Sequence, residues 1–301
     1  MCIRCWSAYF SGAKPPQAGI APNVAAVHSG RRGFVRTTLG LGAIAATSRA
    51  LAQVDVGEAS QMRKLVPAQV LEDSAAQQYR QVLAQARAKG ALAPDNYPPL
   101  QRLRAMANKL IPFAAPWNPR ATQWRWEVNL IASKQINAWC MPGGKIAFYT
   151  GILDQLKLSD DEAAMIMGHE MAHALREHAR ERLAKNQATN LGLRLGAQLL
   201  GLGNVGDAAA SLGAQFFSLK FSRDDEAEAD LVGLEIAARG AYRPEASVSL
   251  WQKMTSASGG ANSGGQLTDF LSTHPSGPQR IRQLQANVPK VQGLYDKARR
   301  S

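Results

Sequence analysis

The segment MGHEMAHALREHARER, residues 167–182, places three histidines and three glutamates in sixteen positions with helical spacing. An α-helix turns by about 100° per residue, so His169 and His173 lie about 40° apart on one face, and Glu170 lies within the same arc. Two imidazoles one turn apart can bind a single metal ion, and the glutamate between them can reach a water molecule bound to that ion. The segment therefore predicts part of a metal site on one helix.

The remaining ligand of this ion must come from outside the pair. His178 follows His169 by nine residues, which on a continuous helix rotates it to the opposite face, so we do not expect it to bind the same ion. The longer pattern H-E-x-x-H-x-x-G-x-x-H fails, because Arg176 and Ala179 stand at the positions of its glycine and its last histidine. A third histidine ligand would have to be His274. A carboxylate from a second helix is the favoured alternative.

The segment DDEAEAD, residues 224–230, offers such carboxylates. Glu226 and Asp230 are four residues apart and share one helical face, whereas Glu228 points elsewhere. This spacing lets Glu226 bind the ion while Asp230 accepts a hydrogen bond from the free ring nitrogen of a ligating histidine. Alternatively, the acids face water and pair with Arg223, as charge runs usually do. The need of the histidine pair for a third ligand favours the metal site.

Four segments together resemble the zinc metallopeptidases of the HtpX, BepA and CAAX-prenyl-protease group: NAWCMPGGKIAFYTGIL, MGHEMAHALREH, SRDDEAEADLVG and STHPSGPQRI. They occur in the order of that family. The resemblance implies that zinc is bound by His169, His173 and Glu226, that Glu170 is the catalytic base, and that Asp230 supports a ligand from behind. The chain resembles a stand-alone periplasmic member, since it shows neither spanning helices nor a C-terminal repeat domain.

The same resemblance matches His274 with a histidine near the metal and Arg280 with a basic position on the following helix. Either side chain could donate a hydrogen bond to the oxyanion that develops during hydrolysis. His274 could instead coordinate zinc and hold the enzyme inactive until a substrate displaces it. A histidine before a proline can also be a simple turn residue.

The expected chemistry is hydrolysis of a peptide bond by water that zinc acidifies and Glu170 deprotonates. The strand that contains Asn137, Ala138 and Trp139 could pair with an extended substrate through its backbone, although an ordinary core strand is an alternative. Cys140, which follows it, we interpret as structural. We therefore expect an endopeptidase that binds one zinc ion and cleaves unfolded or misassembled envelope proteins.

The order of the expected elements indicates an α+β, mainly helical zincin-like domain with a small antiparallel sheet. The expected helices cover residues 75–90, 100–114, 158–186, 222–240 and 243–254, with a last helix after residue 273 and an apolar helical hairpin at 191–217. Short strands are expected at 122–132, 136–141 and 145–151, with a turn at 142–144. A capping box, with Ser159 as N-cap and Glu162 three residues later, opens the helix that carries the histidine pair.

The N-terminal part resembles a twin-arginine export signal. Arg31 and Arg32 precede a weakly apolar stretch that ends in Ala50-Leu51-Ala52. The sequence therefore predicts a removed segment, residues 1–52, and a single periplasmic metallopeptidase domain, residues 53–301. A short amphipathic helix is the alternative, but it does not explain the small residues at the end.

The basic charge of the whole chain, 35 Lys+Arg against 23 Asp+Glu, invites a nucleic-acid interpretation. Residues 1–52 hold six basic residues and no acid, so the predicted mature chain carries 35 − 6 = 29 against 23, a net charge of +6. We therefore expect protein or peptide partners and no nucleic acid, with peripheral membrane contact possible through residues 191–217. The rival functions are a zinc-binding chaperone or adaptor with little proteolysis and a basic surface-binding module. The sequence leaves the oligomeric state open.

Overall fold

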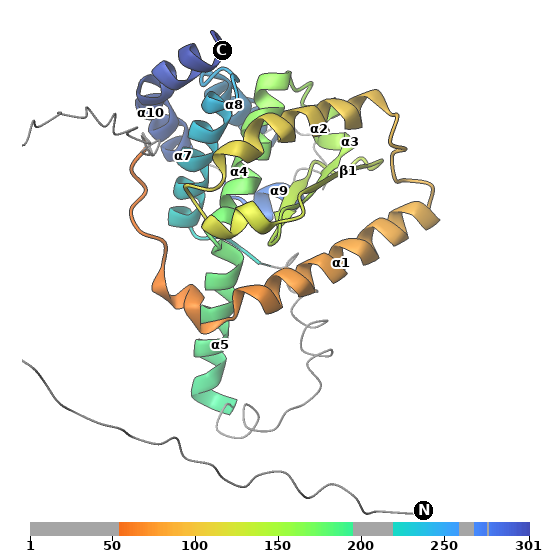
Figure 1. Cartoon of the computed structure of the whole chain (residues 1–301), viewed down its shortest axis with the longest axis vertical. Coiled ribbons are helices and arrows are strands. Elements are labelled where there is room, and N and C mark those ends of the chain that lie inside the picture. The colour runs from red at the N-terminus through yellow and green to blue at the C-terminus, as the bar shows by residue number, and fades with distance from the viewer. Residues whose placement is uncertain (1–53, 195–218, 259–267, 276) are drawn as a thin grey trace, which may run out of the picture. The chain divides into compact units, whose positions relative to one another are not determined.

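The computed structural model describes residues 54–194, 219–258, 268–275 and 277–301 (Figure 1). All of them fall within one compact unit, Ser48–Ser301. The predicted export signal and most of the predicted hairpin at 191–217 lie outside the described residues, so both stay predictions. Among the described helices, none combines the length and the apolar character needed to cross a bilayer.

Most described residues are helical, and the strands are short. The elements in chain order are η1 Gln61–Leu65, α1 Ala68–Ala88, α2 Pro98–Leu110, η2 Ile111–Phe113, η3 Pro119–Gln123, β1 Glu127–Ile131, β2 Ala138–Met141, β3 Lys145–Tyr149, α3 Thr150–Gln155, α4 Asp160–Leu175, α5 His178–Arg194, α7 Arg223–Arg239, α8 Ala246–Ser258, α9 Thr268–Thr273 and α10 Pro278–Ala298. The α+β, mainly helical class predicted from the sequence is confirmed.

The sheet is mixed, so the expectation of a wholly antiparallel sheet is wrong. Its strand order is β1-β3-β2. β2 and β3 form the predicted antiparallel hairpin, but β3 also pairs in parallel with β1. After β1, the connection at residues 132–137 leads to β2, which does not pair with β1. The next strand, β3, lies between β1 and β2 and pairs with both. β2 is consequently left at the edge of the sheet.

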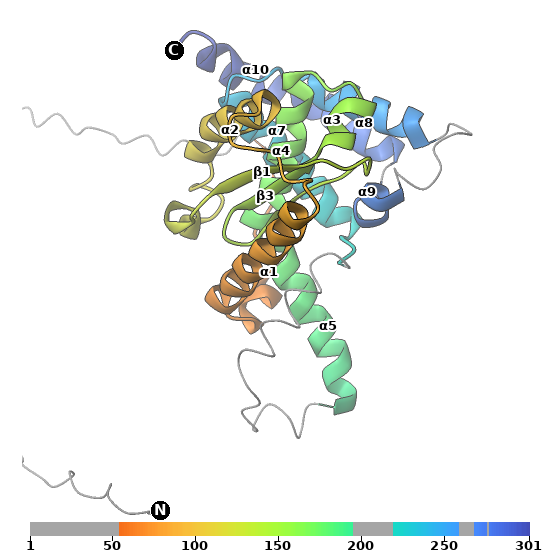
Figure 2. The same cartoon turned by 90° about the vertical axis from the view of Figure 1, so that its right-hand side faces the viewer.

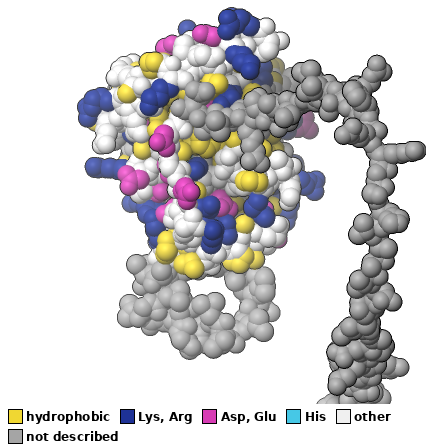
Figure 3. Space-filling model, turned by 60° about the vertical axis from the view of Figure 1, so that its left-hand side comes forward, with side chains coloured by type: hydrophobic (Ala, Val, Ile, Leu, Met, Phe, Trp, Pro, Cys, Tyr) yellow, Lys and Arg dark blue, Asp and Glu magenta, His cyan; other side chains and the backbone are white. Residues whose placement is uncertain are grey.

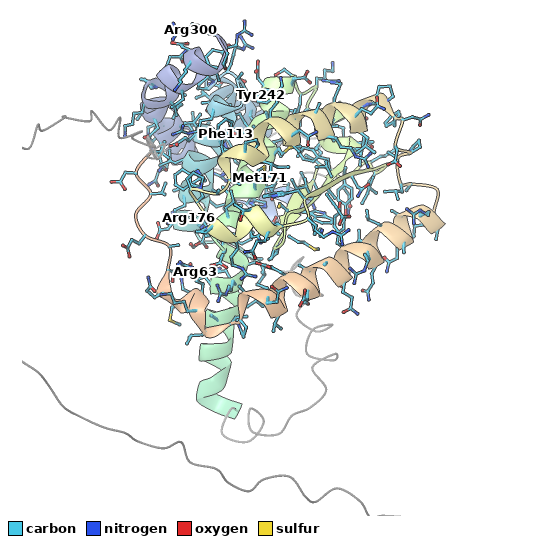
Figure 4. The ribbon with its side chains drawn as sticks, viewed as in Figure 1. Arg63, Phe113, Met171, Arg176, Tyr242 and Arg300 are labelled. Atoms are coloured by element: carbon cyan, nitrogen blue, oxygen red, sulfur yellow. The ribbon has the colours of Figure 1, made fainter. Side chains whose placement is uncertain are left out.

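Helix α4 lies between the sheet and the helices α7 and α8. It packs against α7 and α8 on one side and against β2 on the other, as Figure 1 shows. The predicted capping box is present: the Ser159 hydroxyl accepts from the backbone amide of Glu162, whose carboxylate accepts from the backbone amide of Ser159. Beyond Glu162 nearly every residue of α4 is buried, including Met171 in the middle of the helix (Figure 4).

The helix expected over residues 158–186 is in fact two helices. Glu177 has a φ of 61°, the left-handed conformation that commonly follows the last residue of a helix. Its carboxylate pairs with Arg63 at 2.8 Å and with Arg180 at 2.8 Å, which holds this conformation in place. α4 therefore ends at Leu175, and α5 begins at His178; Figure 2 shows α5 leading downward from the end of α4.

Two glycines allow α4 and α7 to approach closely. A Cβ atom on Gly233 would lie 2.6 Å from the backbone nitrogen of His169 and 2.7 Å from the carbonyl carbon of Gly168. Real Cβ atoms do not approach backbone atoms this closely, so the two helices would have to separate. The contact lies directly beside the histidine pair, and it therefore sets the distance between the histidines of α4 and the acids of α7.

We expect Gly233→Ala to lower the free energy of unfolding by about 1–3 kcal/mol, the usual cost of overpacking a buried contact. Separation of α4 from α7 should also weaken metal binding, because the donor atoms belong to both helices. Urea unfolding and a zinc titration measure the two effects. Gly293→Ala is the matched control, because a Cβ at that position in α10 meets nothing within 4 Å. Unchanged stability and affinity in Gly233→Ala would contradict the close-contact interpretation.

Candidate metal centre

Three elements bring four possible metal-binding side chains together. His169 and His173 come from α4, Glu226 comes from the first turn of α7, and His274 follows α9. Each can offer one donor atom, and these atoms all lie within 4.8 Å of one another. All four residues are buried, Glu226 completely. The expected alternative for Glu226, a solvated acid on a charged face, is therefore excluded.

The spacing of these donor atoms fits a zinc ion. Zinc bonds to nitrogen and oxygen are about 2.0–2.2 Å long in tetrahedral sites, which puts neighbouring donor atoms about 3.3–3.6 Å apart. The Nε2 atoms of His169 and His173 are 3.1 Å apart. Glu226 Oε2 is 3.5 Å from His169 Nε2, and Oε1 is 3.4 Å from His173 Nε2. Two imidazoles and a carboxylate are a donor set that zinc favours.

His274 lies beside the same donors. Its Nδ1 is 3.0 Å from Glu226 Oε1 and 3.4 Å from His169 Nε2. Its ring stacks on Phe270, with centroids 4.6 Å apart. The structure thus places His274 where it could bind the ion as a further ligand, and it also lines the neighbouring cavity.

Asp230 and Arg280 support the donors from behind. Asp230 Oδ1 is 3.0 Å from His169 Nδ1, the contact that the spacing of the acids on α7 predicts. Arg280 donates to both oxygens of Asp230 at 2.7 Å and reaches Glu226 Oε2 with Nη1 at 2.6 Å. Its guanidinium also lies over the ring of Trp251, 3.6 Å from the centroid.

These contacts argue against the one role suggested for Arg280, donation to the oxyanion. Its guanidinium is buried and committed to two carboxylates and to the carbonyl of Pro275, and the residue does not line the cavity. A group in this position orients Asp230 and Glu226 and balances their charge. Of the two residues that could stabilise an oxyanion, the geometry leaves His274.

Glu170 faces a cavity next to the donor atoms. The cavity is lined by Glu170, His173 and His274 together with apolar side chains of β2 and of the segment before α7, among them Trp139, Met141, Leu219 and Phe221. Glu170 Oε1 is buried and accepts no hydrogen bond from the described residues; His274 Nε2 lies 3.7 Å away. A buried carboxylate oxygen without a donor, on a residue that lines a cavity, is suited to take a proton from water.

The predicted substrate strand borders this cavity. Asn137, Ala138 and Trp139 all line it, as do Cys140 and Met141 of β2. Trp139 packs edge-on against Tyr79 of α1, with centroids 5.6 Å apart. Burial raises the pKa of the Cys140 thiol well above its usual value, which disfavours the reactive thiolate and agrees with a structural role.

His178 is the residue that the sequence interpretation missed. It was expected on the opposite face, but the break at Glu177 turns it back toward α4, and its Nδ1 is 2.9 Å from His173 Nδ1. It is buried and does not belong to the group of possible metal donors. Its Nε2 is 3.0 Å from Glu228 Oε2. Helical periodicity could not reveal this contact, because the helix does not continue from His173 to His178.

Burial and charge act in opposite directions on the ionisable groups of the centre. Burial alone would lower the pKa of His169, but hydrogen bonds to Asp230 and Glu226 raise it to about 9. Burial lowers the pKa of His173 well below its usual value and raises that of Glu170. Against the effect of burial, His274 and the other histidines hold the pKa of Glu226 far below normal. In the metal-free centre, the carboxylates of Asp230 and Glu226 therefore favour a proton on His169.

This proton predicts how metal affinity depends on pH. Zinc binds neutral imidazole, so the metal must displace the proton from His169. Because the pKa of His169 is raised to about 9, the group is charged at neutral pH, and each unit of pH toward 9 should strengthen zinc binding about tenfold. Chelator competition at pH 7 and pH 8.5 measures the effect. Equal affinity at the two values would contradict a protonated His169 in the metal-free chain.

The distribution of charge on the surface says less about function than the metal centre does. On the face drawn in Figure 3, basic and acidic side chains are intermixed over the described residues. No histidine is visible on that face, in keeping with the burial of His169, His173, His178 and His274.

Comparison with known proteins gives a consistent result. The model of Peptidase family M48 matches residues 100–288, more than half of the chain. Mitochondrial metalloendopeptidase OMA1 of Arabidopsis thaliana is 38% identical over 164 residues, which cover 54% of this chain and 32% of the relative. Metalloprotease LoiP of Escherichia coli is 28% identical over 233 residues, covering 75% of this chain and 83% of the relative. The Beta-barrel assembly-enhancing protease of Yersinia pestis is 26% identical, covering 64% and 40%.

The extent of these matches differs among the relatives. The chain spans about a third of the OMA1 protein, less than half of the Yersinia pestis protein and most of LoiP. The matched family region contains α4, α7 and α9, and with them every residue of the candidate metal centre.

Proposed function

Since the chain belongs to peptidase family M48, we propose that it is a zinc-dependent endopeptidase. One observation carries the proposal: the donor atoms of His169, His173 and Glu226 converge beside Glu170, which has an oxygen without a donor among the described residues and lines a cavity bordered by an edge strand. Donors, base and a place for a peptide are thus side by side.

The centre would hold zinc through His169, His173 and Glu226. When bound, zinc would polarise the peptide carbonyl and lower the pKa of a water molecule. Asp230 fixes His169 by accepting a hydrogen bond from Nδ1, which leaves Nε2 free to bind metal. Arg280 in turn holds Asp230 and Glu226.

Glu170 would act as the general base. Its Oε1 takes a proton from water as the oxygen attacks the carbonyl carbon, and then gives that proton to the nitrogen that leaves when the peptide bond breaks. Burial raises the pKa of Glu170, which brings the carboxylate closer to the pH at which it must both accept and release a proton.

His274 has two possible tasks in this scheme. Nε2 faces Glu170 and the cavity, where it could donate to the oxyanion. Nδ1 lies among the metal donors, where it could instead occupy the coordination position that a substrate needs.

Replacement of His274 by alanine separates these tasks. If His274 stabilises the oxyanion, we expect His274→Ala to lower kcat by about 10- to 1,000-fold, the range for loss of one donor. If it blocks the metal, peptide hydrolysis should rise instead. Initial rates with a fluorogenic peptide, at equal zinc content, measure either change. An unchanged rate would exclude both tasks and leave a turn residue.

The edge strand suggests how a peptide would bind. Asn137 O accepts from Tyr149 N across the hairpin, and hydrogen-bonded pairs alternate in an antiparallel ladder. The backbone groups of Ala138 and Cys140 therefore point away from β3, toward the open edge beside the cavity. An extended substrate could add a strand there, and such backbone pairing selects unfolded segments with little sequence preference.

We further propose that the substrates are unfolded or misassembled envelope proteins in the periplasm, and that the chain reaches it through a twin-arginine-type signal. The weakly apolar stretch and the final small residues of the predicted export signal, residues 1–52, support this location. The Yersinia pestis relative is named for enhancing beta-barrel assembly, whereas the OMA1 relative is named as mitochondrial. Closer kinship with HtpX and the CAAX-prenyl proteases stays a prediction, as does peripheral contact with the membrane.

Hydrolysis of casein tests the proposal against its rival. The purified chain should cleave casein, lose this activity with a zinc chelator and recover it when zinc is returned. A chaperone or adaptor would bind unfolded casein without producing fragments. Zinc-loaded protein that binds casein but leaves it intact would contradict the endopeptidase assignment.

A further inference from the structure

We propose that His178 positions His173 for metal binding, as the first member of a hydrogen-bonded chain that continues through Glu228 to Arg176. The inference rests on the zinc site proposed above and adds a residue to its support. His178 Nδ1 is 2.9 Å from His173 Nδ1, and His178 Nε2 is 3.0 Å from Glu228 Oε2. The contacts leave His173 Nε2 facing the metal donors.

The direction of each hydrogen bond follows from its neighbour. Glu228 forms an ion pair with Arg176, whose Nε and Nη2 donate to it at 2.8 and 3.1 Å. A carboxylate in such a pair accepts only, so His178 donates to Glu228 from Nε2–H. With a ring proton on Nε2, His178 offers Nδ1 as the acceptor and receives the Nδ1–H of His173. His173 consequently carries its proton on Nδ1 and keeps the Nε2 lone pair for the metal.

The two ligating histidines thus have related supports of different length. His169 is held by an acid and an arginine, Asp230 and Arg280. At His173, an imidazole is inserted between the ligand and the acid, and the acid is again paired with an arginine. An acceptor on the far nitrogen fixes both the tautomer and the ring orientation of a ligand.

The fold holds His178 in place independently of the metal. The left-handed Glu177 starts α5 at His178, and the ring is enclosed, with 2% of the residue exposed. Arg176, at the end of α4, also donates to the carbonyl of Gly57 at 2.9 Å. Figure 4 shows Arg176 and Arg63 in the same part of the molecule, and Arg63 pairs with Glu177. The support therefore reaches from the metal centre to the segment before α1.

The test compares two replacements of His178 in the whole chain. His178→Phe keeps a ring but removes the acceptor, and we expect zinc affinity to fall about 10- to 100-fold, as for other outer partners of a ligand. His178→Asn offers an oxygen near the former Nδ1 and should recover much of this loss. Competition with a chromophoric chelator gives the dissociation constants, and thermal unfolding of the metal-free proteins reports their stability.

Two further variants keep the result interpretable. Glu228→Gln changes the partner of His178 without entering the buried ring position, and it should also weaken zinc binding if His178→Phe fails to fold. Glu181→Gln is the matched control: this buried acid of α5 pairs with Lys185 and not with the centre. Its zinc affinity should equal that of the wild type.

The outcomes separate this inference from the proposed function. If the wild type binds no zinc, the metal centre itself is wrong. If the wild type binds zinc and folded His178→Phe binds it equally well, only the positioning role of His178 is overturned. The role also fails if His178→Asn is as weak as His178→Phe, because packing and not the acceptor would then explain the loss.

Discussion

Glu170→Gln is expected to lower kcat by about 10²- to 10⁴-fold, the usual contribution of a general acid–base group, while zinc stays bound. Glutamine has the size of glutamate but cannot take a proton from water. The residue contributes no metal donor to the cluster of His169, His173, Glu226 and His274, so the affinity for zinc should hold. Peptide hydrolysis and zinc content, measured on one preparation, check both halves of the prediction.

Stability is the control for this substitution. Burial raises the pKa of Glu170, and an acid whose pKa is higher in the folded state than in the unfolded chain destabilises the fold above its ordinary pKa. Neutral glutamine should therefore leave the melting temperature unchanged or higher. Full proteolysis by a zinc-loaded Glu170→Gln protein would refute the role of Glu170 as base.

Glu226→Gln is expected to remove zinc from the centre. The carboxylate is completely buried and lies within 3.5 Å of the Nε2 atoms of both His169 and His173. A neutral amide is a poor substitute for the only carboxylate in this group. We expect the affinity for zinc to fall by more than the about 10- to 100-fold typical of an outer partner, and hydrolysis to fall with it. Chelator competition and peptide hydrolysis measure the two losses.

The same substitution should also destabilise the chain. Arg280 loses one of its two carboxylates, but Asp230 stays. The cost should therefore be smaller than the about 3–5 kcal/mol of a buried pair that is broken completely. Glu235→Gln is the matched control, since Glu235 is equally buried on α7 but pairs with Arg239 and the backbone of Val54. Equal zinc affinity in the two variants would show that Glu226 is not a ligand.

Local sequence patterns predicted those parts of the metal centre whose residues are spaced by one turn of a helix. The spacing of His169 and His173 and that of Glu226 and Asp230 each need only one turn of helix, and both pairs lie on the expected helices. The capping box at Ser159 was equally local. No pattern, however, gives the distance between α4 and α7, which depends on the contact of Gly168 with Gly233.

Tertiary contacts account for what the sequence did not predict. Glutamate is a good helix former, so nothing in the residue type indicates that the helix breaks at Glu177; the pairs with Arg63 and Arg180 become visible only in the fold. The position of His178 depends on that break. The parallel pairing of β1 with β3 likewise depends on the path of the connection between β1 and β2. The order of the strands in the sequence suggested an antiparallel sheet instead.

Charge pairing explains why the role of Arg280 was the least predictable. A basic residue on the helix after His274 is equally compatible with contact to a substrate and with a structural ion pair. The structure places its guanidinium between Asp230 and Glu226 and over Trp251. The arginine therefore pairs with both buried carboxylates and lowers the cost of holding two acids beside the donor atoms.

The zinc content of the purified chain, measured beside a variant in which His169 and His173 are both alanine, tests the central claim most directly. A single ion held by two helices predicts one zinc per wild-type chain and none in the variant, with metal-free stability recorded for both. Wild-type protein without zinc, or a folded variant with as much zinc as the wild type, would contradict it.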